Sequence, residues 1–147
     1  MKYNTEFSIC LKPHGIVKPI ITYGFNHSDE FNITVLENDT KLNFNVDLET
    51  GPKVFYITFE NKTNDTPDMA VEIESVAFEG MTLDRFKWSN KYYPNYPEPW
   101  ASEQTTPLPK YHASSTYLGW NGRWELEFEI PIFTWIHQIE HMGWIYR

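Results

Sequence analysis

The sequence predicts an all-β protein, an antiparallel β-sandwich or jelly roll that ends in one short helix. Ile, Val, Thr, Phe and Tyr are common and aromatic residues make up 17% of the chain, a composition that favours strands. Several segments alternate between apolar and polar residues, and turn-forming residues separate them at intervals of roughly ten residues. With 147 residues and no linker-like stretch, the chain is expected to form a single domain over residues 1–147.

Seven to nine short strands are expected from this pattern. The segments with clear bounds are residues 16–23, 31–36, 41–48, 54–60, 71–80, 115–120 and 123–130. In the first, Pro19 lacks an N–H, which predicts an edge strand or a bulge. The alternation is clearest in 41–48, as in a half-buried antiparallel strand. The segment Glu37–Thr40 predicts a hairpin loop between 31–36 and 41–48.

The remaining strands follow from burial and turn chemistry. Segment 54–60 is apolar on both faces, so it is expected to be a central strand. Segment 71–80 follows a turn-rich loop and ends at Gly80. Asn121-Gly122 joins the last two strands and is the dipeptide favoured in type I′ hairpin turns, because both residues tolerate positive φ. The core face of the last strand is expected to carry Trp124, Leu126, Phe128 and Ile130.

A helical pattern follows the last strand. Pro131 is expected at the first helical position and Gly143 at the C-terminal cap. The apolar residues recur at helical spacing, so that one face of this helix would carry Ile132, Trp135, Ile136 and Ile139.

Charge and cysteine content exclude several classes of function. The net charge is −8 and the pI is about 5.0, and such a surface repels phosphate backbones, so no nucleic-acid partner is expected. Cys10 is the single cysteine, so no internal disulfide can form, which suits a reducing compartment or a particle assembled inside a cell. We expect Cys10 to be a buried apolar thiol. No signal peptide and no membrane insertion are expected, because no apolar run has the required length.

Five Asn-x-Ser/Thr sequons begin at Asn26, Asn32, Asn38, Asn61 and Asn64. Such sequons accept glycans in secreted chains. We interpret them instead as turn and strand-edge residues, where Asn and Thr bond locally to the backbone.

The stretch 87–100, KWSNKYYPNYPEPW, contains too many prolines for a helix and too many large rings for a solvated loop. Rings on a stiff proline-rich backbone are held in place at low entropic cost. A small sandwich cannot easily bury all its aromatic residues, so a cluster of exposed rings would be a binding surface. The candidate ligand-binding residues are Trp88, Tyr92, Tyr93, Tyr96, Trp100, Tyr117 and Trp120.

Glu125, Glu127 and Glu129 alternate along the last strand and so share one face. The pattern resembles the E-x-D-x-E strand of laminarinase-type retaining glycosidases, which are also jelly rolls. The resemblance implies Glu125 as nucleophile and Glu129 as acid/base. Glu127 stands where that family has Asp, and the chain is shorter than a complete catalytic domain of that kind. The alternative, which we favour, is the polar outer face of an amphipathic strand.

Two further patterns concern metals. Residues 137–141 match the H-x-x-E-H zinc signature, but a complete site needs a third protein ligand, and we favour a solvated helix face. Calcium prefers oxygen ligands, and carboxylates lie in turn-rich segments at Asp29, Glu30, Asp65 and Asp68. Calcium is therefore a candidate ligand, although no cofactor is expected to be required.

The segment 71–86, VEIESVAFEGMTLDRF, together with the length and strand pattern, resembles small β-sandwich carbohydrate-binding modules, including calcium-dependent xylan-binding ones. The acidic, Asn-, Tyr- and Trp-rich composition also resembles short proteins of tailed bacteriophages. These resemblances imply a non-catalytic module that binds glycan through exposed aromatic residues, located in the host-cell cytoplasm or on a phage virion. One alternative is a phage structural or assembly protein that uses the same rings against a protein subunit or in a homo-oligomer. A second alternative is a small jelly-roll glycosidase.

Overall fold

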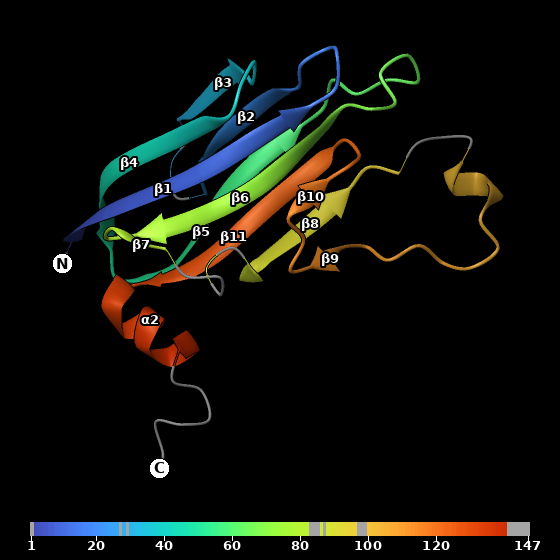
Figure 1. Cartoon of the computed structure of the whole chain (residues 1–147). Helices are drawn as coiled ribbons and strands as arrows, with labels where there is room; N and C mark the ends of the chain where they lie inside the picture. The colour runs from blue at the N-terminus through green and yellow to red at the C-terminus, as the bar shows by residue number, and fades with distance from the viewer. Residues whose placement is uncertain are drawn as a thin grey trace.

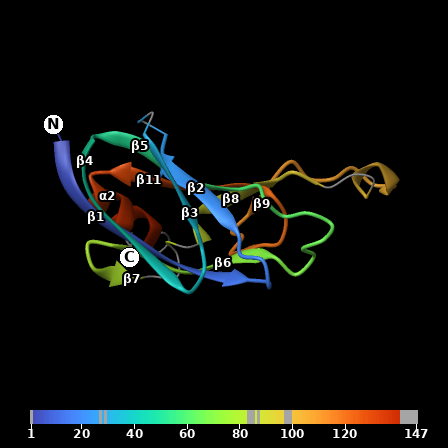
Figure 2. The same cartoon turned by 90° about the horizontal axis from the view of Figure 1, so that it is seen from above.

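A computed structural model describes residues 2–26, 28, 30–82, 86, 88–96 and 100–140 of the chain. Two antiparallel sheets pack face to face and one short helix follows the last strand, so the predicted all-β sandwich is confirmed (Figures 1 and 2). Sheet A has the order β10-β6-β1-β4, with β7 beside β6. Sheet B has the order β3-β2-β5-β11-β8-β9.

The described strands of sheet A are β1 (Lys2–His14), β4 (Thr40–Glu49), β6 (Ala70–Phe78), β7 (Met81–Thr82) and β10 (Tyr117–Leu118). Those of sheet B are β2 (Ile20–Phe25), β3 (Phe31–Val35), β5 (Gly51–Phe59), β8 (Asn90–Pro94), β9 (His112–Ala113) and β11 (Gly122–Ile130). A 3₁₀ turn, η1 (Ala101–Glu103), lies in the connection between β8 and β9, and the helix is α2 (Ile132–Glu140).

Aromatic rings fill the space between the sheets. Phe7 of β1 lies 5.0 Å from Phe55 of β5 and 4.9 Å from Phe78 of β6, measured between ring centroids. The inward-facing residues of β11 are almost completely buried, as predicted for Trp124, Leu126, Phe128 and Ile130. Segment 54–60 is central, because β5 lies between β2 and β11, but its second face is only half covered.

The longest strand, β1, is absent from the strands predicted above. Its residues Thr5, Phe7, Ile9 and Leu11 alternate with more exposed ones and are at most 2% exposed. The alternation was therefore present in the sequence, although Lys12, Pro13 and His14 interrupt the apolar character of the segment. Cys10 lies between these inward residues and is half-buried, so its expected place in the core is corrected.

Both predicted hairpins are wrong. Segments 31–36 and 41–48 pair with β2 and β1 respectively, so Glu37–Thr40 crosses from sheet B to sheet A. Segment 115–120 contributes β10 to sheet A, while β11 belongs to sheet B. Gly122 is a strand residue whose φ lies outside the positive range. The physical reason is that β4 and β11 bury their inward side chains between the two sheets, and this burial outweighs a local turn preference.

Two element boundaries also differ from prediction. The strand expected over 16–23 begins at Ile20, and Ile16 is 91% exposed in the preceding loop. The helix begins at Ile132, and the Pro131 carbonyl accepts a hydrogen bond from Trp135 N–H at 3.2 Å. Pro131 therefore caps the helix and does not occupy its first turn, and Gly143 lies outside the described residues.

The helix α2 closes one end of the sandwich (Figure 1). Its predicted apolar face is confirmed, because Ile132, Trp135 and Ile136 are buried and Ile139 packs against the core. The Trp135 ring stacks on Phe86 at 5.7 Å. Within the described residues, no helix has both the length and the apolar character needed to span a membrane.

Candidate functional site

Part of the aromatic stretch is a strand of sheet B. Residues Asn90–Pro94 form β8, which pairs with β11 on one side and β9 on the other. Tyr92 is only 3% exposed and its hydroxyl donates to the Trp120 carbonyl. Burial raises the pKa of Tyr92 to about 12. The structure therefore places Tyr92 in the core and removes it from the rings that could face a ligand.

Three of the predicted rings stack on one another. The Trp100 ring lies 5.9 Å from Tyr96 and 6.2 Å from Trp120. The Lys62 ammonium lies 4.7 Å from the centre of the Trp120 ring, and its burial lowers the pKa of Lys62. Tyr96 also donates to the Pro109 carbonyl at 2.7 Å. These rings largely use one another as partners and attach the β8–β9 connection to the end of the sandwich.

Two other predicted rings also have partners within the chain. Tyr93 packs against Tyr111 with the ring centroids 5.6 Å apart. Tyr117 is 53% exposed and its ring lies 5.5 Å from the His14 ring. Among the described residues, no ring contact links Tyr93 or Tyr117 to the stacked rings of Tyr96, Trp100 and Trp120, which we call the Trp100 stack.

Trp88 differs from the other candidates. It is 50% exposed, and among the described residues no other ring packs against it. It borders a hollow of about 590 Å³ that is lined by residues of β5, β8 and β11 of sheet B and by Trp135 of α2. The hollow exists because β8 begins only at Asn90, opposite Leu126, whereas β11 continues to Ile130. We define this hollow, bounded by Trp88 and Tyr111, as the Trp88 hollow.

Hydrogen bonds hold the backbone at Trp88 and Ser89 in place. The Ser114 hydroxyl donates to the Trp88 carbonyl at 2.8 Å. The next residue, Ser89, accepts a bond from Glu127 N–H at 3.3 Å. Ser114 has a φ of 56°, and its N–H donates to the Asn90 carbonyl at 2.9 Å. The backbone at Trp88 and Ser89 is thus attached to Ser114, which follows β9, and to Glu127 of β11, and these bonds restrain the segment that carries the Trp88 ring.

The charged lining of the Trp88 hollow is balanced. It contains Lys53, Lys91, Glu127 and Glu129, two groups of each sign, although the whole chain carries −8. Lys91 and Glu127 form an ion pair at 3.4 Å, and Glu127 raises the pKa of Lys91. Hydrogen-bonding groups of Asn90 and Ser114 complete the polar lining, and Trp135 contributes an apolar surface. A ligand without net charge meets a neutral, partly aromatic site.

The three glutamates of β11 do not form one cleft. The Glu125 carboxylate accepts a hydrogen bond from Arg123 at 2.7 Å and lies outside the hollow that Glu127 and Glu129 line. Four residues of a regular strand span about 13 Å, whereas a retaining pair has its carboxyl groups about 5 Å apart. The structure therefore does not bring Glu125 and Glu129 together as a catalytic pair.

The candidate metal ligands are also apart. The register of β2 with β5 pairs Ile21 with Phe59 and Phe25 with Phe55, so the loop with Asp65 and Asp68 and the connection with Glu30 lie at opposite ends of these strands. Asp29 and His141 lie outside the described residues. Within the part of the chain that the structure describes, no three His, Cys, Asp or Glu side chains are grouped around a potential metal position.

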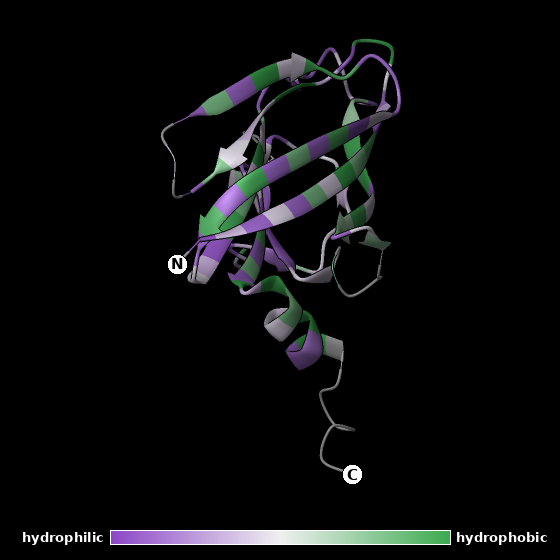
Figure 3. Cartoon of the chain, turned by 90° about the vertical axis from the view of Figure 1, so that its left-hand side faces the viewer, coloured by the Kyte–Doolittle hydropathy of each residue, from purple (hydrophilic) through white to green (hydrophobic). Residues whose placement is uncertain are grey.

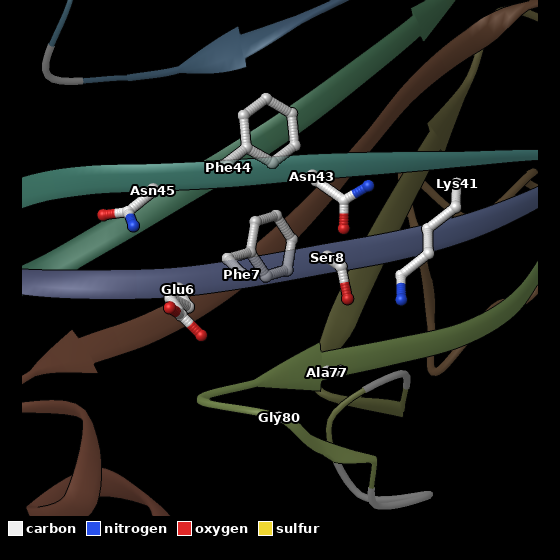
Figure 4. Close-up of a pocket in the computed structure, with 9 residues that line it drawn as sticks. All are labelled: Glu6, Phe7, Ser8, Lys41, Asn43, Phe44, Asn45, Ala77 and Gly80. Carbon is white, nitrogen blue, oxygen red and sulfur yellow. The ribbon is translucent and has the colours of Figure 1, made fainter.

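A second hollow lies over sheet A and has a different character (Figure 4). It measures about 350 Å³ and is lined by polar and small residues of β1, β4 and β6 and by Gly80. Glu6 and Ser8 face Asn45 and Asn43 across the β1–β4 pairing. The rings at its border, Phe7 and Phe44, belong to the core. This hollow therefore offers hydrogen bonds without an exposed ring.

Sequence reasoning missed part of the Trp88 hollow. Tyr111, Lys91, Ser114 and Lys53 were not candidates, because they are separated along the chain and carry no recognisable motif. Tyr111 had the same signal as the predicted rings, since it follows a proline-rich loop. The others are brought together only by the pairing of β11 with β5 and β8 and of β8 with β9.

No protein-family model matches the sequence, and neither a curated protein nor a solved structure matches the chain.

Proposed function

We propose that the chain is a non-catalytic binding module that holds a neutral glycan in the Trp88 hollow. The observation that carries this proposal is the exposed Trp88 ring beside a polar lining of balanced charge. A sugar ring has an apolar C–H face that can pack on an aromatic ring, while its hydroxyls need hydrogen-bond partners at the edge. Trp88 supplies the first requirement, and Glu127, Glu129 and Ser114 are placed to supply the second.

Size and rigidity support the same proposal. The volume of about 590 Å³ lies within the range of about 300–1,000 Å³ that small-molecule sites occupy. The bonds from Ser114 and Glu127 restrain the backbone around Trp88, so little conformational entropy is lost when a ligand packs on the ring. We favour binding over hydrolysis because Glu125 is held by Arg123 outside the hollow.

A glycan array, run with calcium and with a chelator, identifies the ligand class. The Trp88→Ala variant is then titrated against the best glycan. We expect its affinity to fall at least about 30-fold, which corresponds to the loss of about 2 kcal/mol typical of a central aromatic contact. The matched control is Trp100→Ala, which removes a ring that is 39% exposed but already stacked on Tyr96 and Trp120, and it should bind normally.

Three results would count against the proposal. If no glycan binds, the exposed rings would belong to a protein interface. If Trp100→Ala loses binding and Trp88→Ala retains it, the ligand would bind at the Trp100 stack. If the protein releases new reducing ends and Glu129→Gln abolishes this release, the protein would be a glycosidase.

A further inference from the structure

The strand β3 is an edge of sheet B. Sheet B begins with β3, and among the described residues no strand pairs with its outer side. Figure 3 shows β3 at the margin of the sandwich, with its alternating hydropathy visible along the ribbon. An edge strand presents unpaired N–H and C=O groups, which form a template for another strand.

The register with β2 shows which backbone groups of β3 point outward. Leu36 N–H donates to the Pro19 carbonyl at 2.9 Å, in the same register that pairs Ile21 with Thr34. Because hydrogen-bonded and non-hydrogen-bonded pairs alternate in an antiparallel ladder, Thr34 and Asn32 bond to β2. The N–H and C=O groups of residues 31, 33 and 35 therefore point away from β2, toward the free edge.

The same three residues also expose apolar side chains on the outer face of the sheet. Phe31, Ile33 and Val35 are 58%, 64% and 49% exposed. Ile20 of β2 lies opposite Val35 in the β2–β3 pairing, is 41% exposed, and extends this row of apolar side chains. Free backbone groups and apolar side chains thus belong to the same residues.

Two features that protect many edge strands, charged side chains and proline, are missing from β3. Its sequence FNITV contains no charged residue and no proline. The long edge strand of sheet A, β4, has Lys41, Asp47 and Glu49 among its exposed residues. Charged side chains on an edge prevent strand addition, so β4 is protected and β3 is not.

We propose that β3 pairs with β3 of a second copy of this chain, antiparallel about a two-fold axis at Ile33. In this register Ile33 lies opposite Ile33 of the second copy, and Phe31 lies opposite Val35. All three positions expose their N–H and C=O groups toward the partner, so the two strands exchange six backbone hydrogen bonds. Each apolar side chain meets an apolar side chain, as an isologous contact requires.

The absence of charge on β3 favours a second copy as the partner, and the exposed apolar area indicates how strong the contact is. Each copy carries −8, yet the uncharged strand β3 lets two copies approach without opposing like charges in the paired segment. Four half-exposed side chains offer about 400 Å² of apolar surface per copy, taking roughly 100 Å² for each. A standard interface buries about 800 Å² per partner. The dimer is therefore expected to be weak and concentration-dependent.

Sedimentation equilibrium of the full chain from about 10 µM to about 1 mM tests the pairing, because this range includes weak dimers. We expect the mean mass to rise from 17.5 kDa toward twice that value, and to rise further with added salt, which screens the repulsion between the copies. Ile33→Pro should remain at 17.5 kDa, because it removes the outward N–H while leaving the bonds to β2 intact. Ile33→Lys should also remain monomeric, since two ammonium groups would meet at the axis.

The matched control is Phe133→Lys on α2, which changes a side chain that is 58% exposed, as Phe31 is. It should associate like the unmodified protein. Circular dichroism confirms that each variant is folded. A protein that stays monomeric at about 1 mM would overturn the proposal, as would association that Ile33→Pro and Ile33→Lys leave unchanged. Loss of association in Phe133→Lys would assign the contact to α2 and would overturn it as well.

Discussion

Replacing Asn121 by Gly tests the conformation of the β10–β11 connection. In a type I′ turn, Gly at this position is tolerated as well as Asn. In the structure, the Asn121 amide instead bonds to another loop: its oxygen accepts from Lys62 N–H and its nitrogen donates to the Lys62 carbonyl, both at 2.8 Å. The side chain therefore joins the 61–68 loop to the connection between the two sheets, and Gly removes that link.

The expected loss follows from the two bonds. Each net hydrogen bond contributes about 1 kcal/mol, and the partly buried backbone groups of Lys62 lose their partners. We expect Asn121→Gly and Asn121→Ala to lower the free energy of unfolding by about 2 kcal/mol. For a chain of this size, the melting temperature should fall by about 4 to 8 °C. Gly should be slightly worse than Ala, because it adds backbone entropy to the unfolded chain.

Urea denaturation followed by tryptophan fluorescence, together with calorimetry, measures both quantities. Asn64→Ala is the matched control, because Asn64 is exposed in the loop that Asn121 holds, and it should change the free energy of unfolding by less than about 0.5 kcal/mol. If Asn121→Gly is as stable as the unmodified protein, the reasoning is refuted, and the type I′ turn would describe the connection better.

Two further predictions concern the same end of the sandwich. A Cβ at Gly122 would clash with the Tyr93 carbonyl oxygen, so Gly122→Ala should separate β8 from β11 and cost about 3 kcal/mol. Gly119→Ala, with its nearest contact at 3.5 Å, should be neutral in the same urea titration. Burial raises the pKa of Tyr92 from 10.0 to about 12, so the stability that this group contributes is complete below pH 10 and is lost as the pH rises toward 12. Ultraviolet titration of phenolate should therefore show a late-ionising tyrosine that Tyr92→Phe removes, and a titration unchanged by this substitution would contradict the assignment.

The candidate site could be predicted only in part. The sequence identified Trp88 as a candidate because a large ring precedes a proline-rich stretch. The sequence analysis placed Tyr92 in the same group, yet Tyr92 is buried. The error arose because β8 was not recognised as a strand, so its inward and outward residues could not be told apart. Lys91, Tyr111 and Glu127 meet in the hollow only through strand pairing.

The sequence by itself determined the class of fold and which residues face the core within a strand. Alternation at period two is a local property, so the inward residues of β4 and β11 could be assigned without knowing their neighbours. The tertiary structure decided which strands pair. Glu37–Thr40 and Asn121-Gly122 have the composition of hairpin turns, but the strands on either side of each belong to opposite sheets, and β4 and β11 bury their inward side chains between those sheets. Local turn preference contributes about 1 kcal/mol, whereas burial of several large side chains contributes more, so long-range packing determined the topology.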